Sequence, residues 1–412
     1  AVHSPREVFI HQQAGSSTNE VKITSSDLTA YDRFGYAVDI DGEYAIVGAY
    51  GEGEFGFNAG AAYIYERDGC NWIQKAKLRL SNSEAYDLLG RAVAISGGVA
   101  LVGAPGKWAA YIFEKPVGGW TDATETAKLY PSGGMFGGFG ESLDISGEFV
   151  IVGAWEGSTV YFYERPSGGW QDIAETVSFN NYPNAGFFGA SVAIDGIYAV
   201  VGAPHDQSQT SGAVYIYKYD WFWGQRAQLI PSDGQIGDAF GSAVDLDDNR
   251  IIIGTNEDAA YIFSRENNVW SEEQKLTAPS GYGHFATGGK SVTIDKNYAL
   301  VGAYLNSDSL NNSGSAFSFI RTSAGWSFSK QIFQSDFHED DFFGAAVSIS
   351  GPYTIIGAYG KANSSGDLAG AAYIYCTEGD IVTSVQSQQE QTLPVNYDLK
   401  QNYPNPFNPV TT

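Results

Sequence analysis

The chain has 412 residues, with 23 basic and 47 acidic side chains and a formal net charge of −24 at pH 7. Such a charge repels phosphate groups, so neither a nucleic acid nor an anionic membrane surface is expected as a partner. No apolar run approaches the roughly 18 residues that a membrane-spanning helix needs.

Three short apolar segments recur in a fixed order along most of the chain. In the clearest copy they are residues 190–194, 198–201 and 213–217, separated by Asp195-Gly196 and by Gly202-Ala203-Pro204. Asp-Gly is a strong hairpin signal, and proline cannot donate to a sheet ladder, so both separators indicate turns. A fourth segment rich in tryptophan follows, and four strands joined in sequence predict one antiparallel sheet.

This unit occurs seven times with a period of about 50 residues, which is within the range of propeller repeats. One such sheet cannot bury both of its faces alone, so the copies must pack on one another. The repeats therefore predict an all-β fold, a seven-bladed β-propeller of four-stranded antiparallel blades. The copies open at Phe34-Gly35, Leu89-Gly90, Phe139-Gly140, Phe188-Gly189, Phe240-Gly241, Gly288-Gly289 and Phe343-Gly344.

The first residues of the chain predict how the ring closes. Blades one to six each have an outer strand with tryptophan, whereas the seventh copy is followed by polar sequence. Lys22-Ile23 precedes Gly35 by the same spacing as Lys77-Leu78 precedes Gly90, so we expect residues 19–25 to be the fourth strand of blade seven. A strand shared between the two ends removes a free sheet edge. The other outer strands are predicted at residues 72–78, 120–129, 170–177, 221–229, 270–276 and 326–332.

The sequence order Phe-Gly, Gly-Ala-Pro and Tyr-Ile-Tyr resembles the FG-GAP repeat of integrin alpha-chain propellers, from Phe34 to about Tyr375. In that family, calcium binds Asp-rich loops between the first two strands. Here the corresponding turns, such as Asp41-Gly42, have two or three residues and cannot supply the six to eight oxygens that calcium prefers. We expect no metal and no cofactor, and we interpret Asp39 as a strand residue.

The opposite face has long loops between the second and third strands at residues 50–59, 204–211, 304–313 and 359–369. Three of these loops belong to blades six, seven and one, which are consecutive in a closed ring, so we expect them to form one wall. The integrin resemblance implies that this face binds partners, and loops on a rigid scaffold often carry function.

Aromatic side chains are the candidate ligand-binding residues on this face. They could stack on a sugar or a peptide, or they could plug the central channel. Four share one position directly after Gly-Ala or its equivalent, and two more lie in the first long loop. The six are Tyr50, Trp155, Tyr304 and Tyr359, then Phe55 and Phe57.

Catalytic patterns are scarce, so we expect no enzyme and no catalytic residue. The run His338-Glu339-Asp340-Asp341 is interpreted as a solvated acidic turn, because adjacent residues of one loop rarely converge on a metal. His205-Asp206 has no accompanying nucleophile. A polymer-degrading hydrolase stays open as an alternative, since the spacing of two catalytic carboxylates is spatial.

Two cysteines occur at related places in the repeat. Cys70 follows the third strand of blade one, and Cys376 ends the third strand of blade seven. A disulfide between them would lock the ring closure and add about 4–5 kcal/mol. Both lie on the outer part of their blades, however, where the Cα atoms could be too far apart. A disulfide and two free thiols are both open.

After Cys376 the composition becomes polar, and the chain divides into a propeller (1–378), a linker (379–392) and a last segment (393–412). That segment resembles the start of the C-terminal sorting domain of type IX secretion cargo. The resemblance implies contact with the type IX secretion machinery and a secreted or cell-surface location in a bacterium. The sorting motif within this segment consists of Tyr403, Pro404, Asn405, Pro406, Phe407, Asn408 and Pro409.

The sequence thus favours a bacterial extracellular propeller that mediates adhesion by binding a protein or glycan through its long-loop face. A second hypothesis is a structural subunit of a filament or surface layer that self-associates through residues 381–412. A third is an enzyme acting on an extracellular polymer.

Overall fold

The computed structural model describes residues 19–134, 137–181, 186–208, 210–256, 258–280, 291–307, 310–362 and 366–376. The predicted sorting motif, the assembly segment 381–412 and Gly288-Gly289 lie outside these residues. The chain divides into two units, Ala1–Cys376 and Thr377–Thr412, and all described residues belong to the first. No helix among them has the length and apolar character needed to cross a membrane.

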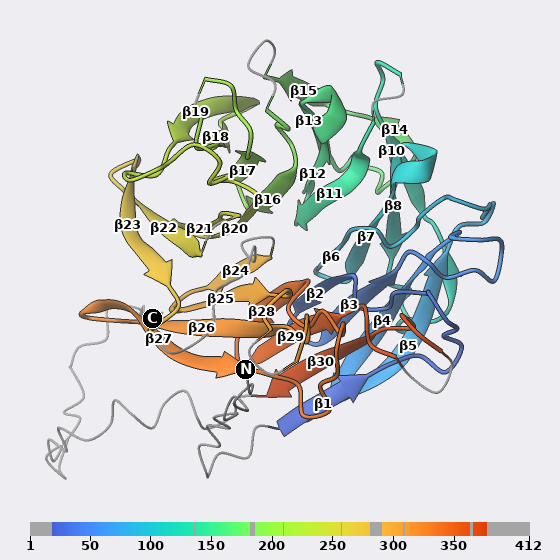
Figure 1. Ribbon diagram of the computed structural model, residues 1–412. Helices are drawn as coiled ribbons and strands as arrows, with labels where there is room; N and C mark the ends of the chain where they lie inside the picture. The colour runs from blue at the N-terminus through green and yellow to red at the C-terminus, as the bar shows by residue number, and fades with distance from the viewer. Residues whose placement is uncertain are drawn as a thin grey trace, which may run out of the picture. The chain divides into compact units, whose positions relative to one another are not determined.

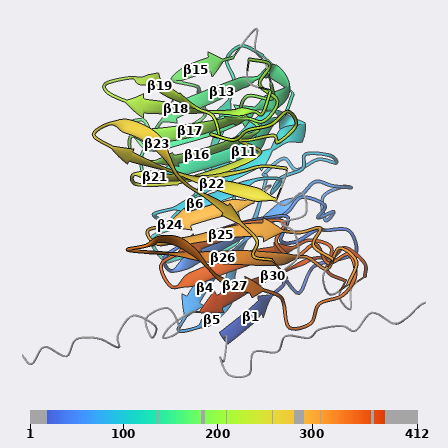
Figure 2. The same ribbon diagram turned by 60° about the vertical axis from the view of Figure 1, so that its left-hand side comes forward.

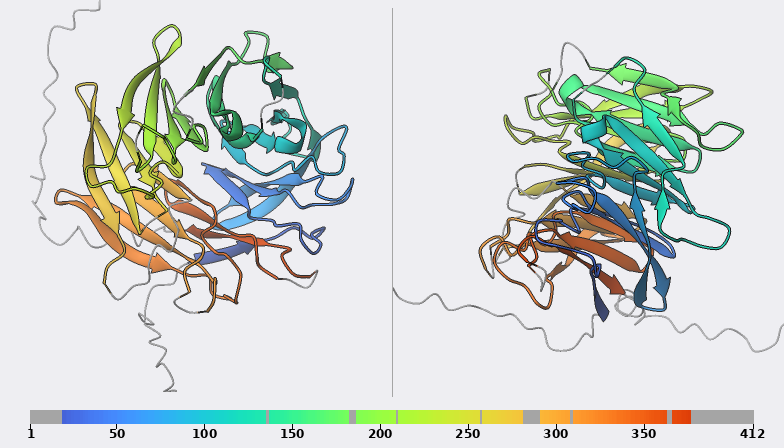
Figure 3. Two further views of the ribbon diagram at one scale, coloured as in Figure 1. Left: turned by 45° about the horizontal axis from the view of Figure 1, so that its top comes forward. Right: turned by 90° about the vertical axis from the view of Figure 1, so that its right-hand side faces the viewer.

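Within the described residues the first unit forms seven sheets that follow one another around a central axis (Figure 1; Figure 3, left). The inner strands contact one another in a ring, with β28 beside β2. The predicted seven-bladed, all-β propeller is therefore confirmed. From blade one to blade seven the inner strands are β2 (Ala37–Asp41), β6 (Val93–Ser96), β11 (Phe139–Ser146), β16 (Ser191–Asp195), β20 (Ala243–Asp247), β24 (Val292–Asp295) and β28 (Val347–Ser350).

The remaining strands continue each blade outward in chain order. The second strands are β3 (Tyr44–Ala49), β7 (Val99–Ala104), β12 (Phe149–Ala154), β17 (Tyr198–Ala203), β21 (Arg250–Gly254), β25 (Tyr298–Ala303) and β29 (Tyr353–Ala358). The third strands are β4 (Ala61–Asp68), β8 (Ala109–Glu114), β13 (Thr159–Glu164), β18 (Ala213–Tyr219), β22 (Ala259–Glu266), β26 (Ser315–Thr322) and β30 (Ala371–Cys376). The outer strands are β5 (Asn71–Arg79), β10 (Ala127–Tyr130), β15 (Val177–Asn180), β19 (Trp223–Leu229), β23 (Val269–Thr277), β27 (Gly325–Ile332) and, in blade seven, β1 (Asn19–Ile23).

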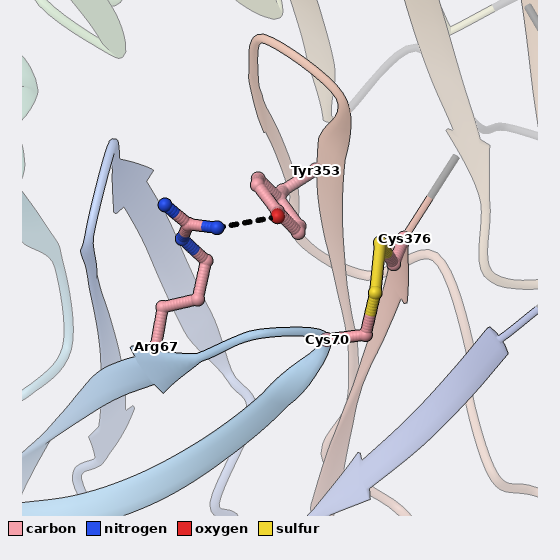
Figure 4. The surroundings of a disulfide bond; sticks show 4 residues. All are labelled: Arg67, Cys70, Tyr353 and Cys376. Carbon is pink, nitrogen blue, oxygen red and sulfur yellow. Dashed lines mark hydrogen bonds between the residues drawn. A yellow bond between two sulfur atoms is a disulfide. The ribbon is translucent and has the colours of Figure 1, made fainter. Parts of the chain in front are cut away.

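The ring closes as the sequence predicts. Strand β1 pairs antiparallel with β30, with Lys22 opposite Tyr373 and Ile23 opposite Ala372. A disulfide joins Cys70, in the β4–β5 turn of blade one, to Cys376 at the end of β30, and their Cα atoms are 5.9 Å apart (Figure 4). Beside it the Arg67 guanidinium donates to the Tyr353 hydroxyl at 2.7 Å. Blades seven and one are thus joined by a ladder, a covalent bond and a polar contact.

Two glycines of the repeat set the spacing between neighbouring blades. Gly48 of β3 lies against the carbonyl of Gly90 in the next blade, and a Cβ at position 48 would overlap that oxygen. Gly90 has φ +87°, a conformation that glycine adopts without strain, and its N–H donates to the Gly103 carbonyl at 3.0 Å. Phe-Gly and Gly-Ala therefore recur because the sheets approach backbone to backbone.

The core consists of layers between adjacent blades, and Figure 2 shows these sheets stacked face to face. One such layer joins Ile46 and Ile64 of blade one to Val102, Tyr111 and Phe113 of blade two, all of them buried. Each sheet therefore gains stability mainly from its neighbours, as expected of a repeat fold.

The outer strands of blades two and three differ from the prediction. Trp120 precedes its strand and packs edge-to-face on Tyr44 of blade one, with ring centroids 6.5 Å apart. The chain then forms β9 (Ala123–Thr124), which pairs parallel with β5 of the preceding blade. The predicted range 120–129 was wrong because Asp122 accepts the Lys77 N–H at 2.8 Å and draws this segment to the neighbouring sheet.

Blade three shows the same arrangement. Trp170 is buried ahead of the strand, and β14 (Ile173–Ala174) pairs parallel with β10. The predicted range 170–177 is therefore corrected to Val177–Asn180. As a result the sheets of blades one and two have five strands instead of four within the described residues.

Candidate functional site

The central channel opens on the long-loop face into a cavity of about 400 Å³, which we call the channel mouth. The inner strands begin at this end of the channel, and the second strands end there. In blade one, for example, Ala37 at the start of β2 lies opposite Gly48 near the end of β3. The mouth is therefore lined both by residues after each Phe-Gly pair and by the first residues of the loops between the second and third strands.

One sector of the mouth differs from the rest. The position directly after Phe-Gly or Leu-Gly is Tyr36, Arg91 and Glu141 in blades one to three. In blades four, five and seven the same position is a small residue, namely Ala190, Ser242 and Ala345. Among the described residues, the mouth therefore has large polar and aromatic side chains at blades one to three and small side chains at blades four, five and seven.

The aromatic side chains of this sector pack in a chain. The Tyr36 ring is 4.6 Å from Tyr50 and 5.3 Å from Tyr359, measured between centroids. Tyr359 stacks on Phe342 at 5.0 Å, and Tyr304 lies 6.3 Å from Phe342. Tyr304 and Tyr359 line the cavity and are half-buried, whereas Tyr50 is only 6 % exposed and supports Tyr36 from behind. Part of the predicted aromatic set is therefore brought together.

Two arginines extend this cluster. The Arg91 guanidinium lies 4.5 Å from the centroid of Tyr36 and 4.8 Å from that of Tyr50. Arg33 lies 5.1 Å from the Tyr50 centroid and donates to the Tyr50 hydroxyl. Cations over aromatic faces are attracted by the ring quadrupole, so these contacts fix the guanidinium groups at the mouth.

Two of the tyrosines at the mouth, Tyr36 and Tyr359, are neutral hydroxyls at ordinary pH. Burial, together with the neighbouring Tyr304 and Tyr36, raises the pKa of Tyr359 to about 12. Burial also raises the pKa of Tyr36, against the lowering effect of Arg91. Both side chains can therefore donate as well as accept hydrogen bonds.

The other predicted aromatic residues lie outside the cavity lining. Trp155 donates from Nε1 to the Glu141 carboxylate at 3.0 Å, and so it lies behind the residue that lines the mouth. Phe55 packs under the Arg79 guanidinium, 5.0 Å from it, and Phe57 packs on Tyr86. Phe55 and Phe57 are exposed, on the surface of blades one and two.

The three consecutive long loops are tied to the next blade by backbone hydrogen bonds. In blade seven the Arg33 N–H donates to the Leu368 carbonyl at 2.9 Å. Corresponding bonds link Asp340 to Asn311, at 2.9 Å, and Leu88 to Asn58, at 3.0 Å. The loops and the entry segments that they contact form a continuous wall from blade six to blade two.

The acidic run at residues 338–341 belongs to this wall. His338, Glu339 and Asp340 are exposed, as predicted for a solvated turn, whereas Asp341 is buried. Asp341 is 1 % exposed, and it accepts from the buried Lys361 ammonium at 2.8 Å and from the His338 N–H. The ion pair holds the blade-seven loop against the entry to its own blade. Among the described residues, no group of three or more His, Cys, Asp or Glu could hold a metal ion.

At its other end the channel is lined by the carboxyls of Asp39, Asp144 and Asp245, in a cavity of about 440 Å³. Each accepts a backbone N–H from the next blade, for example Ile95 on Asp39 at 2.7 Å. Burial raises the pKa of all three, that of Asp245 to about 7. These hydrogen bonds link neighbouring inner strands. Asp39 is therefore a residue of an inner strand, as predicted.

Fold and site together define a ring-closed β-propeller with an asymmetric mouth suited to binding. The sequence profile of the FG-GAP repeat matches residues 17–65, 72–113, 184–217, 223–266, 270–319 and 326–375, which is more than half of the chain. The chain therefore belongs to the FG-GAP repeat family. No curated protein sequence matches it.

Five of the six matched segments are offset by one strand from the blades, the exception being residues 184–217. The segment 223–266, for example, begins with β19 of blade four and ends with β22 of blade five. One sequence repeat therefore spans two neighbouring sheets. The first repeat does the same, because it begins with β1, the outer strand of blade seven, and continues into blade one. Blade three lies between matched segments, yet it has the same inner topology as the other blades.

Two solved structures share the fold. The crystal structure of the WD40 β-propeller domain of Doa1 has a TM-score of 0.51 at 11% identity, covering 87% of this chain and 96% of that chain. A protein from Lactobacillus plantarum also has a TM-score of 0.51, at 15% identity, covering 73% of this chain and 84% of its own. At these identities the similarity concerns the propeller architecture alone.

Sequence reasoning missed five residues of this sector. The signal that could have found some of them is the position after Phe-Gly, where the first three copies have a large side chain and copies four, five and seven have a small one. Aligning the seven copies with one another, and not only their landmarks, would have singled out that position. The missed residues are Arg33, Tyr36, Arg91, Glu141 and Phe342.

Proposed function

We propose that this protein is an extracellular bacterial binding protein that recognises a protein or glycan at the channel mouth and acts in adhesion. The observation that carries the proposal is the asymmetric cavity, in which Tyr304, Tyr359 and Arg91 from three blades converge. A pocket of a few hundred Å³ with aromatic walls and a few polar groups is typical of ligand sites.

Three features support an extracellular location. FG-GAP repeats are typical of extracellular proteins. The Cys70–Cys376 disulfide is of the kind that persists in oxidising compartments. The motif at residues 403–409 resembles type IX sorting signals, and we propose that it directs export. Replacing this motif by Gly and Ser in a type IX-competent bacterium that expresses the chain is expected to keep the protein inside the cell.

The binding site is tested with a panel of glycans, peptides and extracellular matrix proteins. The double variant Tyr304→Ala/Tyr359→Ala is expected to lose binding of whichever member the wild type binds. The matched control is Phe55→Ala/Phe57→Ala, which removes two exposed aromatic rings of the same face and is expected to bind normally. Loss of binding in the control alone would move the site to the first long loop.

Two other outcomes would overturn the proposal. Turnover of any panel member, abolished by a single carboxylate substitution, would show an enzyme. Ordered assemblies formed by the full chain, but not by a chain ending at Cys376, would favour the structural role. Electron microscopy of the purified protein distinguishes this second outcome from binding.

A further inference from the structure

Arg91 stands out at the channel mouth because its guanidinium lacks an anion. It is half-buried and lies over the Tyr36 and Tyr50 rings, but it forms no hydrogen bond or ion pair with any described residue. The nearby carboxylate of Glu141 accepts from Trp155 instead. Arg67 offers a comparison, because it also covers a tyrosine ring, that of Tyr353, and there Glu43 completes the ion pair.

An unpaired guanidinium that is partly removed from water is unfavourable, and an anionic ligand would relieve this cost. Arg33, which also lies over the Tyr50 ring, adds a second positive charge to the same sector. In a chain of net charge −24, this sector is a local site for an anion. A carboxylate is well suited, because guanidinium binds it with two parallel hydrogen bonds.

The surroundings of Arg91 favour a sugar as the carrier of that carboxylate. The Tyr36 and Tyr359 hydroxyls form no hydrogen bond with described residues, and both rings line the cavity. Such side chains offer a flat face to a sugar ring and a hydroxyl to its oxygens. The volume of about 400 Å³ is in the range of small-ligand pockets.

The same walls disfavour a peptide added as a strand, because groups on the inner sheet edges are already bonded. At the mouth, the Ser142 hydroxyl donates to the Gly189 carbonyl at 2.7 Å, and the Ser191 hydroxyl donates to the Gly241 carbonyl at 2.8 Å. Strand addition needs free backbone groups. Recognition at the mouth must therefore use side chains.

We propose that the channel mouth binds an acidic glycan, with a sugar carboxylate on the Arg91 guanidinium and the sugar ring against Tyr359 and Tyr36. This inference rests on the proposed binding function and specifies its ligand. It predicts affinity for polymers rich in uronic acids and little affinity for their neutral derivatives.

The test measures binding of hexagalacturonate, hexamannuronate and a hyaluronan hexasaccharide by calorimetry, beside fully methyl-esterified hexagalacturonate and hexaglutamate. At least one acidic sugar is expected to bind the wild type, and its neutral or peptide counterpart at least about tenfold more weakly. Arg91→Gln is expected to lose at least about tenfold in affinity, and Arg91→Lys to recover part of it. Affinity should also fall as salt rises.

The matched control is Arg265→Gln. Arg265 covers the Tyr198 ring at 3.9 Å and the Trp270 ring at 5.6 Å, and it also has no ion pair among the described residues. The substitution removes the same charge from the same kind of contact away from the mouth, so sugar binding should not change. Thermal unfolding of both variants verifies that they are folded.

Several outcomes would overturn the inference: no acidic sugar binds, the methyl ester or hexaglutamate binds equally well, or Arg91→Gln binds like the wild type. The proposed function would survive these outcomes if Tyr304→Ala/Tyr359→Ala still abolished binding of another panel ligand. If that double variant bound every ligand normally, the proposed function itself would fail.

Discussion

Replacing both Cys70 and Cys376 by Ser is expected to lower the free energy of unfolding by about 5 kcal/mol. The disulfide joins residues 306 positions apart, and in the unfolded chain it closes a loop of that length. Loop-closure entropy grows with the logarithm of loop length and would reach about 6 kcal/mol here; we expect about 5 kcal/mol because unfolded chains keep some residual structure. In the folded state the β1–β30 ladder closes the ring without the sulfur atoms, so the variant should still fold.

Equilibrium unfolding in guanidinium, followed by tryptophan fluorescence, measures the effect. The oxidised wild type should unfold at a higher denaturant concentration than the double variant. It should also show a smaller dependence on denaturant, because a cross-linked unfolded chain exposes less surface. Wild type treated with a reductant serves as the control and should unfold like the variant.

A variant that unfolds at the same midpoint as the oxidised wild type would refute the loop-entropy argument. Hydrogen exchange tests the other premise, that β1 closes the ring alone. If the amides of β1 lost their protection in the variant, the disulfide, and not the ladder, would hold blade seven to blade one.

Three other substitutions test the packing. Trp221 is 94 % exposed and has φ +73°, so Trp221→Gly should leave the free energy of unfolding unchanged or raise it by up to about 1 kcal/mol. Trp223 is only 2 % exposed, so Trp223→Ala should lower the free energy of unfolding by about 3–5 kcal/mol. Urea titrations of both variants measure these changes. Gly202→Ala would push a Cβ into the Gly241 carbonyl of the next blade and should lower the melting temperature; an unchanged value would contradict the spacing role of this glycine. Burial raises the pKa of Asp245 to about 7, so the folded state holds this proton more tightly than the unfolded chain does. Its stabilising contribution is full below about pH 4 and is lost as the pH rises to about 7, and Asp245→Asn should flatten that slope in urea titrations between pH 4 and 8.

The fold could be predicted from the sequence because each interface between blades needs the same backbone approach. A Cβ at position 48 would overlap the Gly90 carbonyl, so only glycine fits there. The same contact recurs between blades, and the glycines therefore recur in the sequence at a regular spacing. The closure by β1 was predictable for the same reason, since Lys22-Ile23 keeps the repeat spacing. The outer strands of blades two and three were not, because Asp122 bonds to a neighbouring sheet and no local pattern reveals that partner.

The site could be predicted only in part. Tyr304 and Tyr359 were found because they share a position after the Gly-Ala landmark, and in blades six and seven this position lines the channel mouth. Arg91 was missed because it lies just before the inner strand β6, in a part of the repeat that was interpreted only as scaffold. Its role depends on Tyr36 of the preceding blade, and only the ring brings these residues together. Phe57 shares the loop but not the position, so its ring packs on Tyr86 instead.

The odd number of blades leaves one irregular junction in the channel. In the channel, Asp39 and Asp144 alternate with Ala94 and Ala193 in the intervening blades, and each carboxyl bridges to the next blade. Seven copies cannot alternate without a seam, and at the junction of blades seven and one Ser348 donates to Asp39 at 2.7 Å instead.

The mouth loses its symmetry at the same junction, where Tyr359 of blade seven meets Tyr36 of blade one. A ligand held there contacts both sides of the closure and binds only the closed ring, so it should stabilise that ring by mass action. An acidic hexasaccharide that binds should therefore raise the melting temperature of the Cys70→Ser/Cys376→Ser variant, and adding Arg91→Gln should remove the increase. A ligand that bound tightly without raising the melting temperature would have to bind the unfolded chain equally well, which would contradict a site built by closure.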